Sequence, residues 1–343
     1  MKKDAPISNR KTDHININLK EDVSSSLSTG LENYQLIHQA LPEMSLADVD
    51  LSQELFDKQQ PVPLLVSSMT GGTDMAARIN RNLATAAQEA GLAMGVGSQR
   101  AAIEKPDLES TYQVRRFAPD ILLFANLGAV QLNYGYGLDE CQRAVDMIEA
   151  DALILHLNPL QEALQPEGDV DFSHLAQKIT RIRKNLGIPV IIKEVGWGIS
   201  TDTARLLMDA GVDAIDVAGA GGTSWSQVEM ARIDEPYRKQ TAGTFIDWGI
   251  PTTESILNVR QASKDVTLFA SGGLQTGIDV AKCLALGANM GGMAGLFLKA
   301  ANESAETALH TMKMILNQLR IAMFACGAKN LLALNDQKII KRR

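Results

Sequence analysis

The sequence predicts an α/β fold, a (β/α)8 TIM barrel with an N-terminal extension and a long loop after strand 6. Three observations predict this fold. Eight short apolar runs recur after residue 60, segments of helical period lie between most of them, and glycine and polar residues follow nearly every run. Continuous apolar runs that alternate with amphipathic helices are typical of parallel strands buried on both faces. Eight such units close a barrel.

The eight expected strands follow one another at a spacing of about 30 residues, except for a gap of about 50 residues between the sixth and the seventh. They cover residues 63–69, 92–98, 121–128, 152–158, 189–196, 214–222, 267–273 and 289–295. A doubly wound open sheet is the alternative, but it usually carries its glycine-rich loop mainly after one strand. Glycine and polar residues after nearly every strand favour a ring of loops around one mouth.

Three further segments complete the chain. Residues 1–60 precede the barrel as an N-terminal extension, and their polar start is expected to be a mobile arm. The barrel itself takes residues 61–334, with an insertion at 223–249 that is long enough to be a lid or binding loop. Its last stretch, 302–334, is expected to be largely helical, and the basic end at 335–343 is expected to be a solvated tail.

Composition excludes several classes of function. The 343 residues suffice for one large barrel or two ordinary domains, and the net charge of -7 argues against nucleic-acid binding. Cys141, Cys283 and Cys326 have no zinc or disulfide spacing, which fits a reducing cytoplasm. The first 14 residues lack the apolar core of a signal peptide, and no apolar run approaches the ~20 residues of a membrane span.

The chemistry of such barrels lies at the carboxyl ends of the strands. Gly272 and Gly273 follow the seventh strand, and Ala294 and Gly295 follow the eighth. Glycines there let backbone N–H groups approach a phosphate beside a helix N-terminus, although glycine pairs can also be plain tight turns. The position after strands 7 and 8 favours a phosphate group.

Lys193 ends the fifth strand, and a lysine in that place is costly unless it meets an anion or extends its head to solvent. We interpret it as a cation beside the electron-rich edge of a cofactor. Neutral hydrogen-bonding groups around a planar ring would come from Ser68, Thr70, Ser98, Asn126 and Thr223. Together with the phosphate site, this set describes a pocket for flavin mononucleotide (FMN).

A second anion is expected near the same mouth. Arg10, Lys11 and His14 lie close together in the N-terminal arm, and Arg100 follows the second strand. The arm residues alone would usually be a solvated charge run, but arginines paired across the mouth would give forked contacts to phosphate oxygens. Glu162 could hold Mg²⁺, which prefers one or two carboxylates with waters and substrate phosphates. The set suggests a diphosphate ester as substrate.

Simpler interpretations exist for two residues after the fourth strand. Glu162 could be an ordinary solvent-facing glutamate, and His156 could be a satisfied histidine of the core or rim.

Seven motifs in this sequence resemble the flavin-dependent, type 2 isopentenyl-diphosphate isomerases, over about 290 residues. They are RKTDHI (10–15), SSMTGG (67–72), VGSQR (96–100), HLNPLQE (156–162), IIKEVGWG (191–198), GAGGTSW (219–225) and SGGL (271–274). The first and fourth of these are the specific ones, because SGGL and GAGG fit many flavin barrels. The resemblance implies interconversion of isopentenyl and dimethylallyl diphosphates by a 1,3-allylic proton shift, with no net redox change. It also implies reduced FMN, NADPH or NADH as reductant, Mg²⁺, a cytoplasmic location, and homotetramers or homo-octamers.

The resemblance also assigns roles to residues, and makes N5 of the flavin the leading acid–base group. Gln161, His156 and Glu229 would be the catalytic side chains, with Gln161 orienting the alkene or relaying through hydrogen bonds, and Glu162 would hold Mg²⁺. Substrate would contact Arg10, Lys11, His14, Ser98, Gln99, Arg100, His156 and Gln161. FMN would contact Ser68, Met69, Thr70, Ser98, Asn126, Lys193, Thr223, Gly272, Gly273, Ala294 and Gly295.

Three rival functions can be weighed on the residues. A 2-hydroxyacid oxidase places a base histidine and an arginine after strand 7, but the segment 271–282 has neither. An inosine monophosphate dehydrogenase-like enzyme needs a nucleophilic cysteine in the strand-6 loop, and 219–227 has none. A non-catalytic flavin- or phosphate-binding barrel would not require His156, Gln161 and Glu162 to converge with a basic arm.

Overall fold

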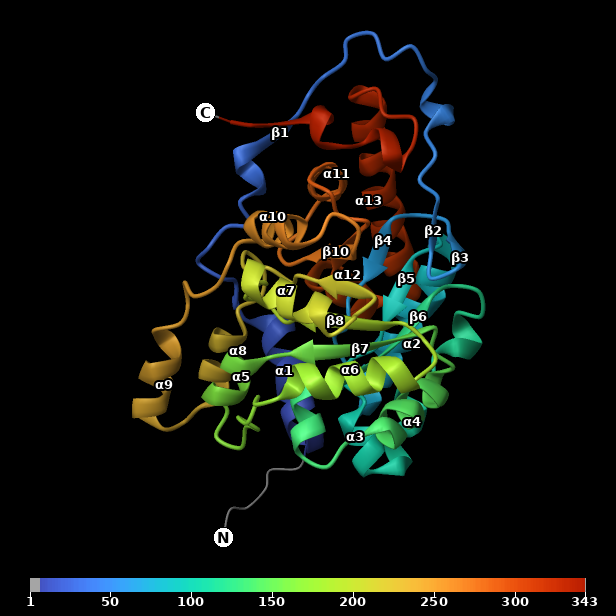
Figure 1. The fold of residues 1–343 in the computed structure, drawn as a ribbon. Coiled ribbons are helices and arrows are strands. Elements are labelled where there is room, and N and C mark those ends of the chain that lie inside the picture. The colour runs from blue at the N-terminus through green and yellow to red at the C-terminus, as the bar shows by residue number, and fades with distance from the viewer. Residues whose placement is uncertain (1–6, 343) are drawn as a thin grey trace.

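Eight parallel strands close into a barrel in the computed structural model, which describes residues 7–342 (Figure 1). Around the barrel the strands follow the order β10-β11-β4-β5-β6-β7-β8-β9, so that each neighbour in sequence is a neighbour in space. The strands are β4 Leu64–Val66, β5 Ala93–Gly95, β6 Leu123–Gly128, β7 Ala152–Leu157, β8 Val190–Glu194, β9 Ala214–Asp216, β10 Thr267–Ser271 and β11 Met290–Met293. All eight coincide with the predicted apolar runs, and the predicted TIM barrel is confirmed. The first six residues of the extension, and Arg343 of the basic tail, lie outside the described residues.

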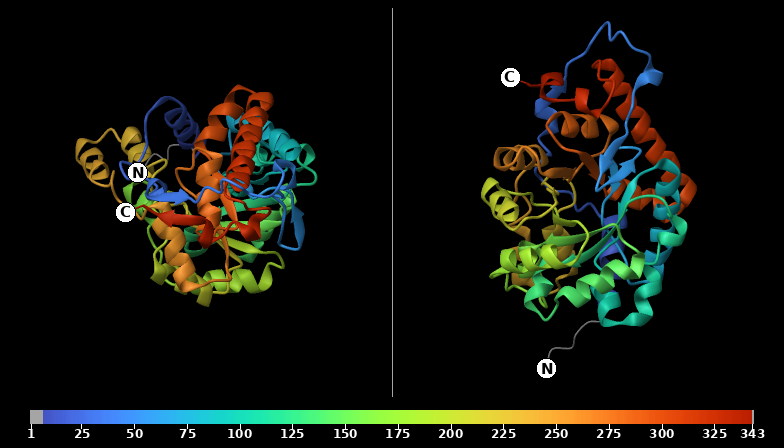
Figure 2. Two further views of the ribbon diagram at one scale, coloured as in Figure 1. Left: turned by 90° about the horizontal axis from the view of Figure 1, so that it is seen from above. Right: turned by 45° about the vertical axis from the view of Figure 1, so that its right-hand side comes forward.

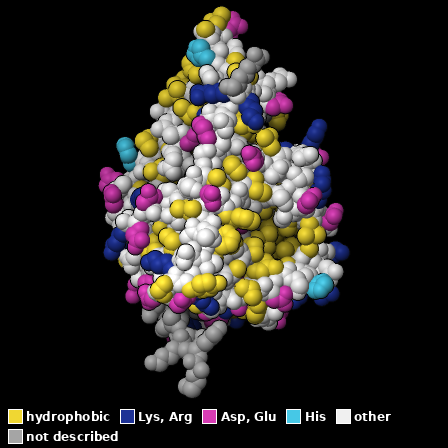
Figure 3. Space-filling view, turned by 90° about the vertical axis from the view of Figure 1, so that its left-hand side faces the viewer, with side chains coloured by type: hydrophobic (Ala, Val, Ile, Leu, Met, Phe, Trp, Pro, Cys, Tyr) yellow, Lys and Arg dark blue, Asp and Glu magenta, His cyan; other side chains and the backbone are white. Residues whose placement is uncertain are grey.

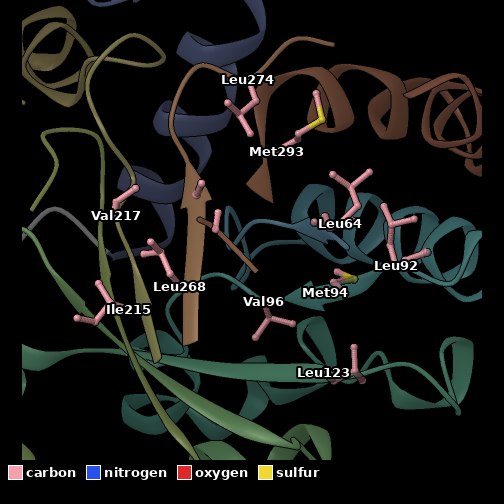
Figure 4. Close-up of a cluster of buried hydrophobic side chains, with 14 of the residues drawn as sticks. Leu64, Leu92, Met94, Val96, Leu123, Ile215, Val217, Leu268, Leu274 and Met293 are labelled. Carbon is pink, nitrogen blue, oxygen red and sulfur yellow. The ribbon is translucent and has the colours of Figure 1, made fainter. Parts of the chain in front are cut away.

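Alternation along the strands divides their side chains between two cores. Leu65, Phe124, Ile191 and Phe269 point into the barrel and pack on one another near the starts of the strands. The strand residues that alternate with this inward set belong to the outer core with the surrounding helices, among them Leu64, Met94, Leu123 and Leu268 (Figure 4). Because side chains alternate, the next inward positions toward the carboxyl ends are Asn126, His156, Lys193 and Asp216. The strand period therefore aims four polar side chains at the mouth.

Helices follow most of the strands and surround the barrel (Figure 2). Several begin at a hydroxyl cap, because the side chains of Thr73, Ser200, Thr276 and Ser304 accept a hydrogen bond from a backbone N–H of the first turn. The helices of the barrel region are α2 Asp74–Ala90, α3 Arg100–Glu104, α4 Leu138–Ile148, α5 Pro159–Leu164, α6 Leu175–Asn185, α7 Thr201–Asp209, α8 Trp225–Arg232, α9 Pro236–Gly243, α10 Thr252–Ala262, α11 Gly277–Ala285, α12 Gly295–Glu303 and α13 Ala305–Ala325. Short 3-10 turns occupy η1 Leu31–Asn33, η2 Leu46–Asp48, η3 Pro106–Thr111, η4 Arg115–Phe117, η5 Ala129–Asn133, η6 Leu331–Ala333 and η7 Asp336–Lys338.

The polar start of the N-terminal extension, expected to be a mobile arm, forms the docked helix α1 Ile7–Lys20. Ile15 and Ile17 of this helix are buried, and Ile17 packs with Val23 and Val228 in a small apolar cluster. Ile15 and Ile17 are two residues apart, which is not the three- or four-residue spacing that indicates a helix in a sequence. Their burial nevertheless holds α1 against the barrel.

The rest of the extension closes the opposite end of the barrel. The hairpin of β2 Gln53–Leu55 and β3 Lys58–Gln60 carries Leu55 and Phe56 onto the inward-facing core. Phe56 makes edge contacts with Phe124 and Phe269, whose ring centroids lie 6.2 and 6.3 Å away. The hairpin therefore plugs the end at which the strands start.

The insertion and the C-terminal end are more ordered than a loop and a tail. The insertion at 223–249 contains α8 and α9. The predicted terminal helix is confirmed as α13, and Gly327 follows it with φ +69°. The solvated tail was a wrong expectation for 339–341, because β12 Ile339–Lys341 pairs antiparallel with β1 Tyr34–Leu36 and Ile339 is buried. No helix within residues 7–342 has the length and apolar character to cross a membrane.

Candidate active site

A cavity of about 710 Å³ opens at the carboxyl ends of the barrel strands. Its wall combines the strand-end loops with α1 and with the start of the insertion. The predicted site residues in this wall are Arg10, Lys11, His14, Ser68, Met69, Thr70, Ser98, Arg100, Asn126, His156, Gln161, Glu162, Lys193, Thr223, Gly272, Gly273, Ala294 and Gly295. One cavity thus brings together nearly all the residues that the sequence predicts for the site.

The end of the cavity near β10 and β11 combines closely packed glycines with the start of a helix. Gly272 has φ +108°, and a Cβ placed on it would lie 2.1 Å from the carbonyl oxygen of Gly219, so a side chain cannot fit there. Helix α12 begins at Gly295 without a side-chain cap, and Gly295 and Leu296 line the cavity. Uncapped first-turn N–H groups attract a phosphate by hydrogen bonding and by the helix dipole.

The polar atoms of the inner wall fit the remainder of an FMN. The hydroxyl oxygens of Ser67 and Ser68 are buried and have no hydrogen-bond partner within the described chain, although both residues line the cavity. Buried hydroxyls normally have a hydrogen-bond partner, so these two hydroxyls are available to a polar group in the cavity. Neutral donors beside a phosphate cradle match a flavin ring with its ribityl phosphate.

Lys193 has a partner inside the protein. Its ammonium lies 3.0 Å from Asp216 Oδ2 and donates to Ser271 Oγ at 3.2 Å, and the same hydroxyl donates to Asp216 Oδ1 at 2.6 Å. Lys193 and Asp216 are register partners on β8 and β9. The anion that stabilises this buried lysine is therefore the Asp216 carboxylate on the next strand. The net charge of the pair is close to zero.

His156 is a neutral group in this site. Burial, with the nearby charge of Lys193, lowers the pKa of its imidazole to about 4. Its Nδ1 lies 2.8 Å from Asn126 Oδ1, and an amide oxygen can only accept, so Nδ1 carries the proton. A histidine with that pKa does not act as a proton donor in the imidazolium form at neutral pH.

The side chain of Gln161 is held by two neighbours. Its amide nitrogen donates to Glu229 Oε1 at 3.0 Å, and its amide oxygen accepts from Asn158 at 3.2 Å. Glu229 also lies 3.0 Å from His14 Nε2 and 2.6 Å from Arg232. Burial would raise the pKa of Glu229, but these hydrogen bonds and charges outweigh burial and lower it. Glu229 is ionised behind Gln161 and does not itself line the cavity.

Three basic side chains gather at another part of the wall. Arg10 donates to Gln165 at 2.9 Å, while Arg100 pairs with Glu104 at 2.7 Å and with Asp169 at 2.6 Å. Lys11 bonds to the carbonyl oxygen of Ser98 at 2.7 Å. Arg10 and Lys11 come from α1, and Arg100 begins α3, so the docked extension completes this basic wall.

Glu162 lies in the cavity wall with both carboxylate oxygens engaged. Oε1 accepts from Asn158 at 2.9 Å, and Oε2 accepts from the backbone N–H of Asp169 at 2.8 Å. Burial raises the pKa of this carboxyl. Among residues 7–342 no cluster of three or more His, Cys, Asp or Glu side chains could hold a metal ion. A single carboxylate fits the Mg²⁺ of a diphosphate, for which phosphate oxygens and waters supply the other ligands.

The structure corrects one predicted contact and adds several residues. Gln99 was expected to touch substrate, but it is fully buried outside the cavity wall, where its amide bonds to Ala144 O and to the backbone N–H of Asn126. It caps the start of α3, which turns its side chain toward α4. Sequence analysis missed Ser67, Gln131, Asn158, Gln165, Asp169 and Asp216.

The comparisons with known proteins agree on one family. A family profile described as FMN-dependent dehydrogenase matches residues 158–341, a little more than half of the chain. The isopentenyl-diphosphate delta-isomerase of Nostoc sp. is 51% identical over 339 residues, covering 98% of this chain and 97% of the relative. The enzyme of that name from Synechocystis sp. is 56% identical over 323 residues, covering 94% and 93%. That of Rickettsia bellii is 50% identical over 322 residues, covering 94% of each.

Solved structures confirm the architecture. A crystal structure of a mandelate oxidase variant superposes with a TM-score of 0.68, at 19% identity and 98% coverage of both chains. Another mandelate oxidase structure gives a TM-score of 0.65 at 18% identity, covering 97% of this chain and 96% of the other. At this identity the likeness concerns the fold alone.

Proposed function

The chain belongs to the isopentenyl-diphosphate delta-isomerase family and carries the FMN-dependent dehydrogenase domain, and on this premise we propose that it interconverts isopentenyl and dimethylallyl diphosphates with FMN as cofactor. The observation that carries the proposal is one cavity lined both by an uncapped helix start with glycines and by a group of basic side chains. The uncapped start of α12 and its glycines suit the FMN phosphate, while Arg10, Lys11 and Arg100 suit a diphosphate.

The reaction moves a double bond by a 1,3-allylic proton shift with no net redox change. Protonation of the terminal alkene carbon places positive charge on the tertiary carbon, and loss of a proton from the neighbouring methylene completes the shift. Reduced FMN, when bound, supplies an electron-rich ring that stabilises this charge, and N5 as an acid–base group. The residues of the chain position the alkene and hold the diphosphate.

The basic wall holds the diphosphate end of the substrate. Arg10 and Arg100 each present a guanidinium, which binds phosphate oxygens in a forked geometry, and Lys11 adds a point charge. Arg100 is fixed in place by Glu104 and Asp169, so little side-chain entropy is lost when it binds the anion. We assign Ser98, His14 and neutral His156 to the same end as hydrogen-bonding groups.

Gln161 orients the hydrocarbon end. Its amide is fixed at both ends by Glu229 and Asn158, so its position in the wall is set before substrate binds. An amide is too weak a base to abstract a proton, so Gln161 acts by orientation. Ionised Glu229 accepts the hydrogen bond that fixes the amide of Gln161.

The remaining cofactor assignments stay as predicted from the sequence: Ser68, Met69, Thr70, Asn126, Lys193, Thr223, Gly272, Gly273, Ala294 and Gly295 contact FMN.

Two elements keep water from the reacting carbons. Helix α1 supplies part of the cavity wall, and Ser24, just beyond it, forms a β-bridge with Thr223 at the start of the insertion. The hydroxyl of Thr223 also bonds to Asn18 of α1 at 3.4 Å. Exclusion of water protects a cationic species from hydrolysis.

We extend the proposal to the metal, the reductant and the setting. Glu162 holds Mg²⁺ on the diphosphate, and NADPH or NADH keeps the flavin reduced. The three cysteines are buried and free, which supports a reducing cytoplasm.

A homotetramer or homo-octamer is supported by exposed apolar groups of the insertion, where Tyr237 and Trp248 are 75% and 59% exposed. Hydrophobic side chains gather around a hollow on the side of the molecule where α9 lies (Figure 3).

The proposal is tested by product analysis under anaerobic conditions. The purified protein should contain FMN, and after reduction it should convert isopentenyl diphosphate to dimethylallyl diphosphate with less than one NADPH oxidised per product. Gln161→Asn should lose at least about tenfold in kcat, because the shortened amide cannot reach both partners. Gln142→Asn, on the outer helix α4, is the matched control and should keep full activity.

Stoichiometric oxidation of NADPH would instead indicate a redox enzyme, and flavin without turnover would indicate a binding protein. Full turnover of Gln161→Asn would overturn the role of Gln161 while leaving the activity in place.

A further inference from the structure

Tyr112 stands directly behind the basic wall of the cavity. It follows η3, its side chain is fully buried, and it does not line the cavity. The ring fills the notch left by Gly71, where an added Cβ would lie 1.9 Å from Tyr112 Cε1. Its hydroxyl oxygen meets two groups, the carbonyl oxygen of Ser98 at 2.7 Å and the ammonium of Lys11.

The direction of each hydrogen bond in this group follows from its chemistry. A carbonyl oxygen can only accept, so the Tyr112 hydroxyl donates its proton to Ser98 O. An ammonium can only donate, so Lys11 donates to the Tyr112 oxygen and also to Ser98 O at 2.7 Å. Two of the three ammonium N–H donors are thereby fixed on neutral acceptors, and the third is left for a ligand.

Lys11 keeps its charge uncompensated. Within residues 7–342 no carboxylate lies within ion-pair distance of its ammonium, in contrast to Lys193 and Arg100. The ammonium also lies 5.0 Å from the centroid of the Tyr112 ring, where the ring's electron density favours a cation. A neutral cradle holds a cation in place without cancelling the field that an anionic substrate would feel.

We propose that Tyr112 is a positioning residue, which holds the Lys11 ammonium in a neutral cradle as an unpaired cation for the diphosphate of the substrate. The inference rests on the proposed function for the identity of the substrate. Tyr112 touches neither substrate nor FMN, and it acts through Lys11.

Diphosphate binding by Lys11 should depend on pH. Burial, followed by the charge of Arg10, lowers the pKa of Lys11 to about 7, and Glu104 on α3 opposes this shift. His156 also feels the charge of Lys11 and is itself neutral, so it adds no opposing charge. The protonated, binding form of Lys11 dominates below its pKa and is lost as pH rises through that value. Removal of the Tyr112 oxygen removes an acceptor of the ammonium, so the loss should begin at lower pH.

The test compares pyrophosphate binding by the FMN-containing protein and its variants, measured by calorimetry over a pH range of about 6 to 9. Tyr112→Phe keeps the ring in the Gly71 notch, and Lys11 still donates to Ser98 O, so the fold should persist. Near neutral pH its pyrophosphate Kd should rise about tenfold, the order expected when a charged group loses one hydrogen bond. The pH at which binding weakens should fall by about one unit. Pyrophosphate also titrates in this pH range, but its titration affects every variant equally and does not change the difference between a variant and the wild type.

Tyr136→Phe is the matched control, because the buried Tyr136 hydroxyl has no hydrogen-bond partner among the residues that the structure describes. It should leave both the Kd and its pH dependence unchanged. Lys11→Met should weaken binding further and abolish the pH shift, and Tyr112→Phe added to Lys11→Met should change the Kd by less than about twofold. Equal losses from Tyr112→Phe with and without Lys11 would overturn the proposal, because they would indicate a general structural role.

Steady-state kinetics separate this inference from the proposed function. With isopentenyl diphosphate, Tyr112→Phe should raise KM about tenfold and change kcat less than about twofold. Wild-type protein that binds pyrophosphate but forms no product would defeat the proposed function alone. An active wild type whose Tyr112→Phe variant keeps the wild-type KM and pH profile would defeat the role of Tyr112 alone.

Discussion

At the residue scale, the charged groups of the cavity differ in how far the protein has already neutralised them. Lys193 is paired with Asp216, and Arg100 is paired with two carboxylates. Lys11 has no such partner among the described residues, and Glu162 meets only neutral donors. Lys11 therefore presents an uncompensated cation to the diphosphate, and Glu162 presents a carboxylate to its metal. Arg10, which is bonded to the amide of Gln165, and the paired Arg100 complete the basic wall.

Glu162→Gln tests the metal assignment. An amide keeps the size of the side chain but loses the charge, so the Mg²⁺ concentration for half-maximal activity should rise by at least about tenfold, the order seen when the support of a metal ligand is lost. Diphosphate binding should weaken in parallel, while the FMN content, measured by absorbance, should stay at the wild-type level. Glu303→Gln, at the exposed end of α12, is the control and should match wild type. Loss of FMN from Glu162→Gln would show that the metal has been assigned to the wrong residue.

The sequence predicted individual site residues where one rule sufficed. Polar residues at strand ends led to Ser68, Asn126 and His156, because the carboxyl ends of the barrel strands share one mouth. Asp216 was missed, although Lys193 and Asp216 become register partners once β8 and β9 are aligned. The contact of Arg100 with Asp169 joins loops that are far apart in sequence, and local patterns carry no information about such a pair.

At the element scale, glycines decide how closely the strand-end loops approach one another. Gly272 would place a Cβ 2.1 Å from Gly219 O, and Gly222 would place one 2.5 Å from the backbone nitrogen of Gly273. The loops after β9 and β10 therefore pack backbone against backbone beside the expected phosphate. Sequence patterns predicted the glycines as a phosphate cradle, but the packing of one loop on the other depends on tertiary structure.

Gly272→Ala tests the cradle. The added methyl meets backbone atoms that cannot move alone, so the loop should shift and the purified protein should contain less than half of the wild-type FMN, as measured by flavin absorbance. Gly211→Ala is the matched control, since Gly211 also has positive φ, +76°, but nothing lies within 4 Å of an added Cβ. That variant should lose about 1 kcal/mol of stability from backbone strain and keep its full FMN content. Equal FMN contents in the two variants would contradict the cradle.

The insertion and the extension show where element prediction failed. The sequence placed a loop at 223–249 because the gap between the sixth and seventh strands is long, and an arm at the N-terminus because that segment is polar. The structure has α1, α8 and α9 there. Ile17 of α1 and Val228 of α8 bury each other, and Ala242 of α9 packs in a second small apolar cluster. Tertiary burial of isolated apolar residues outweighs a polar composition.

At the scale of the whole molecule, stability and chemistry occupy opposite ends of the barrel. The strand starts are filled by an apolar layer under the β2–β3 hairpin, and the strand ends carry the polar cavity. The pairing of β1 with β12 further ties the extension to the C-terminal end. The barrel could be predicted because eight apolar runs repeat along the sequence. The β2–β3 hairpin lies before the first of these runs, and its few residues show no periodic pattern that would predict it.

Phe56→Ala tests this separation of the two ends. Phe56 is half-buried and contacts Phe124 and Phe269, so its truncation should cost about 2 kcal/mol, less than for a fully buried phenylalanine. In a chain of this size that loss should lower the thermal midpoint by roughly 3 °C, as measured by circular dichroism. FMN content and kcat at 25 °C should stay within about twofold of wild type, because Phe56, Phe124 and Phe269 do not line the cavity, which lies at the other end of the strands. Leu332→Ala removes a side chain that is 86% exposed and should leave the midpoint unchanged. A loss of FMN from Phe56→Ala without a lower midpoint would show that the two ends are coupled.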